Sequence, residues 1–310
     1  METKKHRVVV IGAANLDIAG KVSGEIVPRD SNLGTIRLGM GGVGRNIAHN
    51  LALLGCDVHL IAPFGDDGAA QTLLRGCLDA GIDLSSAFTV PGGATSSYLY
   101  LMDSDGEMQV AVNDMSIVES LDVEHLEERR HVIETAEACV IDANLSEETL
   151  GWIAENVGCP LFCDPISCVK APRIRPILGR LHALKPNRME AEELTGIAID
   201  DDESLMRAAD ALIATGLERA FVSLGKRGLL CASRDERFLL ERTTHQAINS
   251  TGAGDSMMAA LVWAHLEGLS LEDAGWAGLA SSSINVESPE TVNPALGADA
   301  LRNRIEEMRG

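Results

Sequence analysis

Positive charge is scarce in this sequence. Its 310 residues include 26 lysines and arginines against 46 aspartates and glutamates, so the formal net charge is -20. A surface of this sign repels the phosphates of nucleic acids and the anionic headgroups of membranes. The imbalance therefore argues against a nucleic-acid or membrane partner and favours a small-molecule ligand.

The N terminus lacks a long apolar run. A polar start, Met1 to Arg7, leads directly into Val8 to Ile11. Those four residues are too few for the core of a secretory signal or for a membrane span. We therefore expect a cytoplasmic protein.

The cysteines lack the spacing of a disulfide or zinc framework. There are seven, an odd number, and none belongs to a C-x-x-C pair. Such usage suits a reducing compartment. Cys159, Cys163 and Cys168 lie close together around an apolar strand, and we interpret them as packing residues rather than metal ligands.

Apolar residues and glycines, in contrast, are abundant. The chain is 45% hydrophobic and contains 30 glycines, a composition typical of globular proteins. Its length suits one large α/β domain over residues 1–310, to which we expect a lid to be attached.

Short apolar runs alternate along the chain with longer segments of three-to-four periodicity. This alternation predicts parallel strands joined by crossover helices, and hence a layered α/β sheet. The predicted strands are 8–11, 58–62, 139–142, 161–164, 183–185 and 220–224; the predicted helices are 44–54, 69–80, 147–156, 203–215, 253–266 and 271–285. Ligands of open α/β sheets bind beyond the carboxyl ends of the strands, so the chemistry should lie in the turns there.

Two segments interrupt this alternation, at about 14–40 and 95–115. The second contains two apolar runs, Tyr98 to Leu101 and Met108 to Val112, separated by Asp103-Ser104-Asp105-Gly106, which predicts a β-hairpin. Two strand-rich insertions in one α/β chain predict a small sheet that covers the site as a lid.

The segment Thr251-Gly252-Ala253-Gly254-Asp255 opens a predicted buried helix. A turn of this kind directs several backbone N–H groups and the positive end of the helix dipole to one point, where a transferring phosphoryl group would be stabilised. Asp255, beside that point, could accept the proton of an attacking hydroxyl. The other interpretation is an aspartate that the dipole alone favours in a first helical turn.

A second glycine-rich turn, Gly39 to Gly44, opens the helix 44–54 and formally matches G-x-G-x-x-G. It does not follow the first strand of a βαβ unit, as the dinucleotide fingerprint requires. We predict instead that its glycines let a ligand approach the backbone while nearby polar side chains bond to the ligand's hydroxyls. The residues with these roles would be Asn15, Asp17, Gly41, Gly42 and Asn46. For the first two, the alternative is a polar loop after a strand.

Asn187 and Glu190 stand three apart, between a predicted strand and an acidic helix. On one helical turn this spacing places both side chains on the same side, where they could orient the waters of a hydrated Mg2+ ion. The alternative is a helix start with an acidic first turn. Ser223 to Gly228 ends another strand with two glycines, as a nucleotide-edge turn or a simple hairpin would.

Together these segments resemble the ribokinase or PfkB family of carbohydrate and nucleoside kinases, in the family's order along nearly the whole chain. Its two signatures correspond to Gly41 to Asn46 and Thr251 to Asp255, and its N-x-x-E motif to Asn187 to Glu190. The resemblance implies a ribokinase-like layered α/β/α sheet with a small β-sheet lid, and ATP-dependent phosphorylation of a hydroxyl. Within the family, segments such as Gly12 to Gly20 are most similar to the pseudouridine kinases, which implies the 5′-hydroxyl of pseudouridine as the acceptor.

The resemblance also implies roles for individual residues. Asp255 would be the base, and Gly252, Ala253 and Gly254 the anion hole. Substrate contacts fall to the five residues named above. Apart from the resemblance, the lid residues Ser97 and Asn113 offer donors and acceptors that could read the base, and the alternative is that they are ordinary polar residues of the surface. The ATP contacts would be Lys185, Asn187, Ser223, Gly225, Gly228 and Thr251, with Asn187 and Glu190 holding Mg2+ through water.

One position departs from the family pattern. Asn249 stands where many members have an aspartate that helps to hold an activating potassium ion, so dependence on K+ stays open. The acceptor could also be another nucleoside or a free sugar, such as adenosine, ribose or fructose. From other classes, an NAD-type oxidoreductase and an inactive nucleoside sensor stay as alternatives. The apolar hairpin 98–112 permits a homodimer through the lid.

Overall fold

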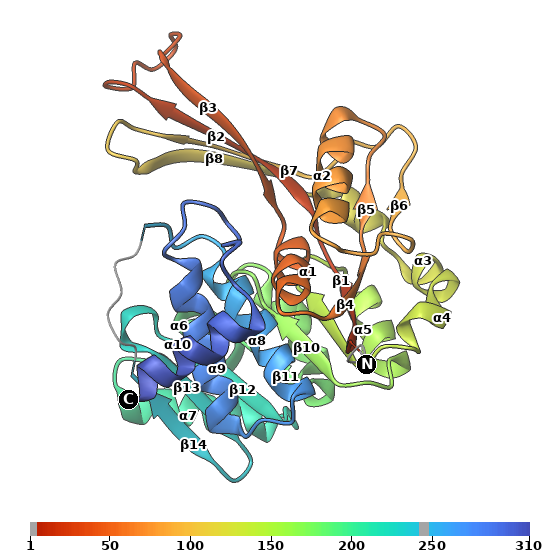
Figure 1. The fold of residues 1–310 in the computed structure, drawn as a ribbon, viewed down its shortest axis with the longest axis vertical. Coiled ribbons are helices and arrows are strands. Elements are labelled where there is room, and N and C mark those ends of the chain that lie inside the picture. Colours follow the sequence, from red (N-terminus) through yellow and green to blue (C-terminus); the bar gives the residue numbers. More distant parts are fainter. Residues whose placement is uncertain (1–4, 242–247) are drawn as a thin grey trace.

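The main sheet of the protein has eight strands in the part of the chain that the computed structural model describes, residues 5–241 and 248–310. Met1 to Lys4, most of the polar start, lie outside the described residues. The strands are β1 (Arg7–Ile11), β4 (Asp57–Ile61), β9 (Ala138–Asp142), β10 (Leu161–Asp164), β11 (Ala183–Leu184), β12 (Arg219–Ser223), β13 (Leu229–Ser233) and β14 (Arg237–Leu240). Their order is β14-β13-β12-β11-β10-β9-β1-β4 (Figure 1). Among these strands, β13 pairs antiparallel with both β12 and β14, and every other neighbouring pair is parallel.

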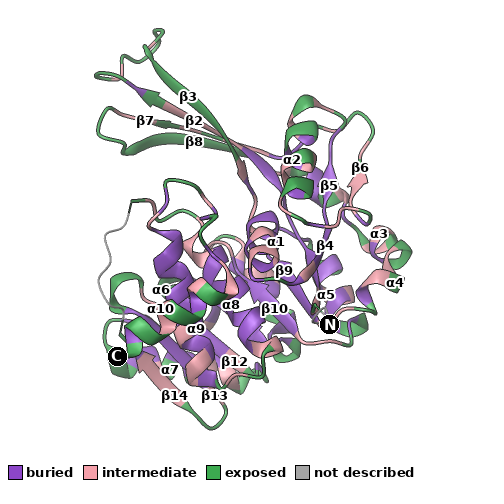
Figure 2. Ribbon diagram, in the orientation of Figure 1, coloured by how far each residue is buried: buried purple, intermediate pink, exposed green. Residues whose placement is uncertain are grey.

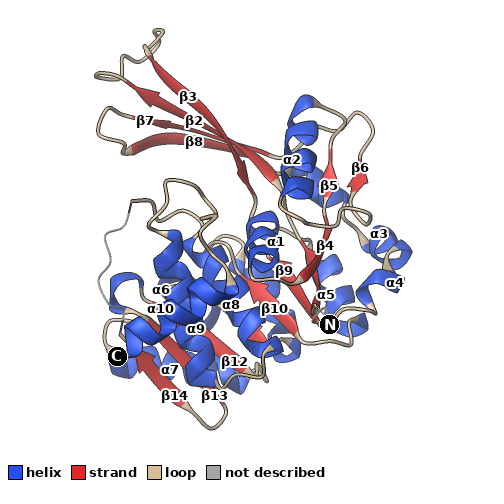
Figure 3. Cartoon of the chain, viewed as in Figure 1, coloured by secondary structure: helices blue, strands red, loops and turns tan. Residues whose placement is uncertain are grey.

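Helices cover both faces of this sheet (Figure 3). One face carries α1 (Val43–Leu53), α2 (Gly68–Asp79), α8 (Ala253–Leu266), α9 (Leu271–Asn285) and α10 (Ala298–Arg309). The other carries α3 (Val123–Glu128), α4 (Arg130–Ile133), α5 (Glu147–Asn156), α6 (Arg188–Thr195), α7 (Asp202–Ala214) and the 3-10 segments η1 (Ser116–Ser120) and η2 (Ala171–Arg180).

Strand β1 explains why there are two cores. Val8 and Val10 pack into the first core, whereas Val9 and Ile11 pack into the second. Successive side chains of a strand point to opposite faces, so an uninterrupted apolar run needs apolar partners on both sides. The expected α/β/α layering is confirmed.

The predicted elements agree closely with the observed ones. Each of the six predicted strands and six predicted helices is present, and its ends differ from the prediction by at most one residue. The sequence analysis did not include α3, α4, α10, the antiparallel pair β13 and β14, or the short pair β5 (Pro63–Phe64) and β6 (Phe88–Thr89).

The two interrupting segments form a second, four-stranded sheet. Its strands are β2 (Asn15–Val22), β3 (Gly34–Gly41), β7 (Ser97–Met102) and β8 (Met108–Asp114), in the order β3-β2-β7-β8. We call it the small sheet. It extends away from the main body (Figure 1), and Figure 2 shows that β3 and β8 are almost entirely exposed.

The register of the small sheet divides its side chains between two faces. Side chains of paired residues share a face. Asp17 pairs with Tyr98, which pairs with Asn113, so these three lie in one row. The opposite face has Ser97 and Asp114 at one end and is otherwise mostly apolar, with Ile18, Ile36, Leu38, Leu99, Leu101, Val110 and Val112.

Two sequence expectations concern membranes and metals. Within the described residues, none of the helices is both long enough and apolar enough to cross a membrane. The same residues contain no group of three or more His, Cys, Asp or Glu side chains placed to hold a metal ion. Cys163 is buried in the core, where it pairs with Ile141 of β9, and Cys159 and Cys168 are partly exposed.

Candidate active site

Helix α8 begins at a turn in which Gly252 has a left-handed backbone, with φ of 79°. A side chain there would be strained and would also meet the Thr291 backbone, since its Cβ would lie 3.0 Å from the Thr291 carbonyl carbon. The helix behind the turn is buried from Asp255 to Ala264. The positive end of a buried helix dipole therefore opens at this turn.

Asp255 lies in the first turn of α8 and is 9% exposed. Asn46 of α1 donates a hydrogen bond from Nδ2 to Asp255 Oδ2, at 2.7 Å. Burial raises the pKa of Asp255 to about 7, and the charge of Asp164 acts in the same direction. The bond from Asn46 and the charges of Lys185 and Arg45 oppose that rise in pKa.

Arg45 orients this arrangement, although sequence reasoning gave it no role. Its guanidinium is buried and donates to Asn46 Oδ1, to the Met40 carbonyl, and to the Gly41 carbonyl at 3.2 Å. Because Arg45 occupies Asn46 Oδ1, the Nδ2 group is left to bond Asp255. In the sequence, Arg45 stands beside Asn46 in the signature Gly41 to Asn46, where a surface position explains an arginine equally well.

Asn15, Asp17 and Gly41 meet at the base of the small sheet. Asn15 Nδ2 donates to Asp17 Oδ1 at 2.6 Å. A Cβ on Gly41 would lie 2.6 Å from Asn15 Nδ2, and Gly42 has φ of 93°, so both glycines are required by this close approach. Burial raises the pKa of Asp17 to about 6, against the opposing charge of Arg45.

Asp142 is a buried carboxylate that the sequence analysis did not single out. Its Oδ2 accepts from the backbone N–H groups of Ala13 and Gly44, at 2.9 and 3.0 Å, and its Oδ1 accepts from Asn144 N–H at 3.0 Å. It thus ties the turn after β1 to the start of α1. Lys170 donates to Asn144 Oδ1.

Lys185 extends from the end of β11 towards the turn of α8. A Cβ on Gly254 would lie 3.2 Å from Lys185 Nζ, so the ammonium lies close to this turn. Lys185 Nζ pairs with Asp164 Oδ2 at 3.1 Å, and both side chains are 6% exposed. Burial alone would lower the pKa of Lys185, but the charges of Asp164, Glu190 and Asp255 raise it.

Asn187 and Glu190 form a capping box at the start of α6. Asn187 Oδ1 accepts from Glu190 N–H at 2.9 Å, and Glu190 Oε2 accepts from Asn187 N–H at 2.8 Å. Both hydrogen bonds of a capping box are therefore present, as expected from the alternative interpretation of these two residues as the start of a helix. Burial raises the pKa of Glu190, and the charge of Lys185 opposes that rise.

The remaining nucleotide candidates lie beside this cap. Ser223 N–H donates to the Pro186 carbonyl at 2.9 Å, and Asn187 forms a parallel bridge with Ser223. Gly225 and Gly228 have positive φ on either side of η3 (Gly225–Arg227), which connects β12 to antiparallel β13. The segment is therefore a hairpin connection at the carboxyl end of β12.

The side-chain amides of two asparagines hold the turn that contains Thr251. Asn249 Oδ1 accepts from Thr251 N–H at 2.9 Å, and Asn249 Nδ2 donates to the Pro289 carbonyl at 3.1 Å. Asn285 Nδ2 donates to the Thr251 carbonyl at 3.0 Å. Asn249 thus holds the glycine turn through hydrogen bonds, without a charge.

The small sheet separates the two residues predicted to read a base. Asn113 shares its face with Asp17 and Tyr98. Ser97 pairs with Leu16 and Asp114, hence it faces the other way, and its Oγ donates to the Thr95 carbonyl at 3.1 Å. Tyr98, which sequence reasoning missed, lies on the Asp17 face, with its ring centroid 5.4 Å from that of Tyr100. The sequence signal that could have pointed to Tyr98 is that both tyrosines of the whole chain lie in one predicted strand.

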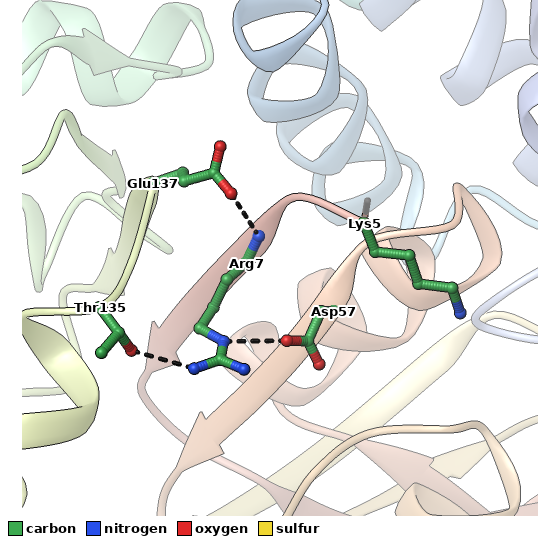
Figure 4. A pocket seen from close by; sticks show the side chains of 5 residues that line it. All are labelled: Lys5, Arg7, Asp57, Thr135 and Glu137. Carbon is green, nitrogen blue, oxygen red and sulfur yellow. Dashed lines mark hydrogen bonds and ion pairs between the residues drawn. The ribbon is translucent and has the colours of Figure 1, made fainter. Parts of the chain in front are cut away.

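A pocket with a volume of about 550 Å³ lies at the amino ends of β1, β4 and β9 (Figure 4). It is lined by Lys5, Arg7, Asp57, Thr135 and Glu137. Arg7 donates to Asp57 Oδ2 at 2.9 Å and to Thr135 Oγ1 at 3.3 Å. These groups hold the start of β1 at the amino ends of the strands, on the side of the sheet opposite to the residues described above.

The glycine segment 39–44 does not form a dinucleotide turn. Gly39 and Gly41 belong to β3 of the small sheet, and α1 begins only after them. No βαβ unit opens at this motif, so the geometry offers nothing to the oxidoreductase alternative.

Comparisons with known proteins agree with this geometry. The family model described as "pfkB family carbohydrate kinase" matches residues 5–296. The pseudouridine kinase of Escherichia coli K12 is 40% identical over 98% of this chain and 97% of its own length. The structure of a carbohydrate kinase from Agrobacterium tumefaciens is 29% identical with a TM-score of 0.86, over 97% of both chains. The fold is also that of an Arabidopsis thaliana ribokinase, 21% identical with a TM-score of 0.87, over 98% of this chain and 99% of that one. The chain therefore belongs to the pfkB family of carbohydrate kinases.

Proposed function

We propose that this protein transfers the γ-phosphoryl group of ATP to the 5′-hydroxyl of pseudouridine, forming pseudouridine 5′-phosphate and ADP. The observation that carries the chemistry is a buried carboxylate, Asp255, in the first turn of a helix whose N-terminal turn can hold an anion. The choice of acceptor rests on the likeness to the E. coli pseudouridine kinase.

Asp255 acts as the general base. One of its oxygens accepts the proton of the 5′-hydroxyl as the hydroxyl oxygen bonds to the γ-phosphorus, and the bond from that phosphorus to the bridging oxygen breaks. A pKa of about 7 leaves the carboxylate largely ionised near neutral pH while making it a stronger base than a solvated aspartate. The backbone N–H groups of Gly252 to Gly254 stabilise the equatorial oxygens in transit.

The residues near Lys185 fit a nucleotide with Mg2+. Mg2+ neutralises phosphate charge and keeps several of its waters, so it needs few protein ligands. Glu190 is a buried acid in the first turn of α6, and the N–H of Asn187 orients its carboxylate by a hydrogen bond to Oε2. We assign Asn187 and Glu190 to the waters of that ion, and Thr251, Ser223, Gly225 and Gly228 to ATP.

The small sheet serves as the lid in this proposal, over a single kinase domain. Asp17 bonds ribose hydroxyls at its base, together with Asn15 and Asn46. Tyr98 and Asn113 follow in the same row, where an aromatic face can stack on a uracil ring and an amide can accept its N–H groups. Closure over the acceptor excludes water, which would otherwise compete for the phosphoryl group.

The apolar face of the small sheet supports a homodimer. Ile36, Leu38 and Val112 are 76%, 65% and 62% exposed on it. A contiguous exposed apolar surface on a sheet is typical of an interaction site. A second copy, presenting the same face about a two-fold axis, would cover it.

The decisive experiment is MgATP-dependent phosphorylation of pseudouridine, uridine, adenosine, ribose and fructose by the purified protein. We expect kcat/KM to be at least tenfold higher for pseudouridine than for any other acceptor, with phosphate on the 5′-oxygen by NMR. A preference for another acceptor would retain the kinase and reject pseudouridine. Absence of turnover with every acceptor would contradict the proposed function and favour the nucleoside-sensor alternative.

A further inference from the structure

We propose that Asp164 is a positioning residue of this site: it holds the Lys185 ammonium against the turn of α8, where the γ-phosphate of ATP will lie. The inference rests on the proposed function, because it assigns Asp164 to the transfer that Asp255 begins. Asp164 acts through Lys185 and touches no reacting atom.

The geometry defines where Lys185 is held. Its Nζ is 3.1 Å from Asp164 Oδ2 and 3.2 Å from the position that a Cβ on Gly254 would take. Gly254 belongs to the turn that stabilises the transferring group. A lysine at that point adds a full positive charge to the partial charges of the backbone N–H groups.

The loop after β10 is strained in a way that fixes Asp164. Ile166, a β-branched residue, has φ of 67°, a conformation that such residues rarely adopt. In that conformation its N–H donates to Asp164 Oδ1 at 2.8 Å. One oxygen of Asp164 is thus fixed by backbone and the other by Lys185. Strain of this kind persists where the surrounding structure requires it, often at functional sites.

The surrounding charges explain why Asp164 is needed. Lys185 is buried, and a buried ammonium without an opposite charge to bond is strongly destabilising. The charged groups that face it are Asp164 of β10, Glu190 of α6 and Asp255 of α8. Of these, Asp164 is the one that bonds to it. A buried ion pair is weak as a source of stability, so its presence here calls for a functional explanation.

The first test measures nucleotide binding without any acceptor. Calorimetry with Mg2+ would compare ADP with the β,γ-imido analogue of ATP, which adds the γ-phosphate that Lys185 should meet. We expect Asp164→Asn to reduce the preference for the analogue over ADP by about tenfold to a hundredfold, the worth of one charge-assisted contact. Asp57→Asn is the matched control, since it removes the same charge from an aspartate–arginine pair at the opposite edge of the sheet, and it should leave the ratio unchanged.

The second test uses the pH profile of kcat/KM. Loss of the Asp164 charge should lower the pKa of Asp255, so the acid limb of the profile shifts to lower pH in Asp164→Asn. Lys185→Met should move the acid limb the other way, because Asp255 then loses a positive neighbour. A structural role would instead reduce activity equally at every pH.

The double variant completes the design. If Asp164 acts through Lys185, adding Asp164→Asn to Lys185→Met should leave the nucleotide ratio of Lys185→Met unchanged. Should Asp164→Asn fail to fold, Asp164→Glu keeps the charge and should keep the acid limb in place while lowering kcat. An unchanged nucleotide ratio in folded Asp164→Asn or in Lys185→Met overturns the inference. Neither nucleotide measurement requires pseudouridine, so a wrong acceptor would not be mistaken for a wrong role of Asp164.

Discussion

At the scale of single residues, burial and charge around Asp255 determine when this side chain can act as a base. Removal from water favours its protonated form, and Asp164 reinforces that preference. Asn46 bonds to the ionised form and limits the rise. The burial that makes Asp255 a stronger base also means that its ionised carboxylate destabilises the folded state.

Asp255→Asn should therefore abolish catalysis and stabilise the protein. We expect kcat to fall by about 10²- to 10⁴-fold, the usual contribution of a general base. The folded-state pKa of about 7 lies above the ordinary 3.8, so the folded state binds the proton more tightly and the free energy of unfolding falls as pH rises from about 4 to about 7. The difference corresponds to at most about 4 kcal/mol at pH 8. Urea unfolding at pH 5 and pH 8 would measure it.

The gain in stability should be large at pH 8 and small at pH 5. Asn46→Ala serves as the control, since it also removes the 2.7 Å hydrogen bond but leaves the buried carboxylate in place, and it should destabilise the protein at pH 8. Equal destabilisation by Asp255→Asn at both pH values would contradict the description of Asp255 as a buried base.

The residues of the site differ in how far sequence could reveal them. The role of Gly252 and Asp255 could be predicted from the sequence, because glycines just before a buried helix are typical of an anion-binding turn. Arg45 could not be assigned, because only the fold shows that its guanidinium is buried against Asn46. Ser97 was grouped with Asn113 although the period of two along β7 separates their faces.

At the scale of elements, the residues proposed to contact the substrate, Asp17, Tyr98 and Asn113, lie in one row on one face of three neighbouring strands. The row depends on register, since a shift of one residue would exchange the polar and apolar faces. It predicts that base recognition can be weakened without altering phosphoryl transfer.

Tyr98→Leu should raise KM for pseudouridine by about tenfold, because stacking of a base on an aromatic ring is worth about 1–3 kcal/mol. KM for ATP should not change. Tyr98→Phe keeps the ring and should behave like the unaltered protein. Steady-state kinetics on pseudouridine and on free ribose would separate the effects, since ribose has no base to stack. A comparable loss with ribose would refute stacking.

The main sheet could be predicted from sequence because its strands are apolar on both faces and end in recognisable turns. Val8 to Ile11 and Leu161 to Asp164 are examples. The helix α10 escaped prediction because its residues are mostly polar and only Leu301 and Met308 are buried. The strands β13 and β14 escaped because they pair antiparallel after a turn that contains no Asn-Gly or Asp-Gly signal.

At the scale of the whole molecule, the apolar face of the small sheet and the net charge of -20 act in opposite directions. Apolar surface favours self-association, whereas like charge opposes it. The charge is screened at moderate salt, while apolar burial is not. A dimer through the small sheet should therefore tighten as ionic strength rises.

The double variant Leu38→Lys with Val112→Lys should convert the dimer to a monomer, because it places two charges at the centre of the proposed interface. Light scattering after size-exclusion chromatography would report the mass at several concentrations and salt levels. The matched control is Leu78→Lys, an apolar residue 60% exposed on α2, which should leave the mass unchanged. A monomer before any substitution would refute the interface.

The contrast between α8 and the strands β3 and β8 has a consequence for how such an enzyme diverges. The base sits on a helix buried from Asp255 to Ala264, whereas nearly every side chain of β3 and β8 is exposed. Substitutions on exposed strands rarely exceed about 0.5 kcal/mol in stability, whereas core substitutions often exceed 2 kcal/mol. Of the three residues proposed to read the acceptor, Asn113 lies on β8, so acceptor preference can drift there through nearly neutral steps while the transfer chemistry stays under strong constraint. Directed evolution towards new acceptors should therefore begin at Asn113.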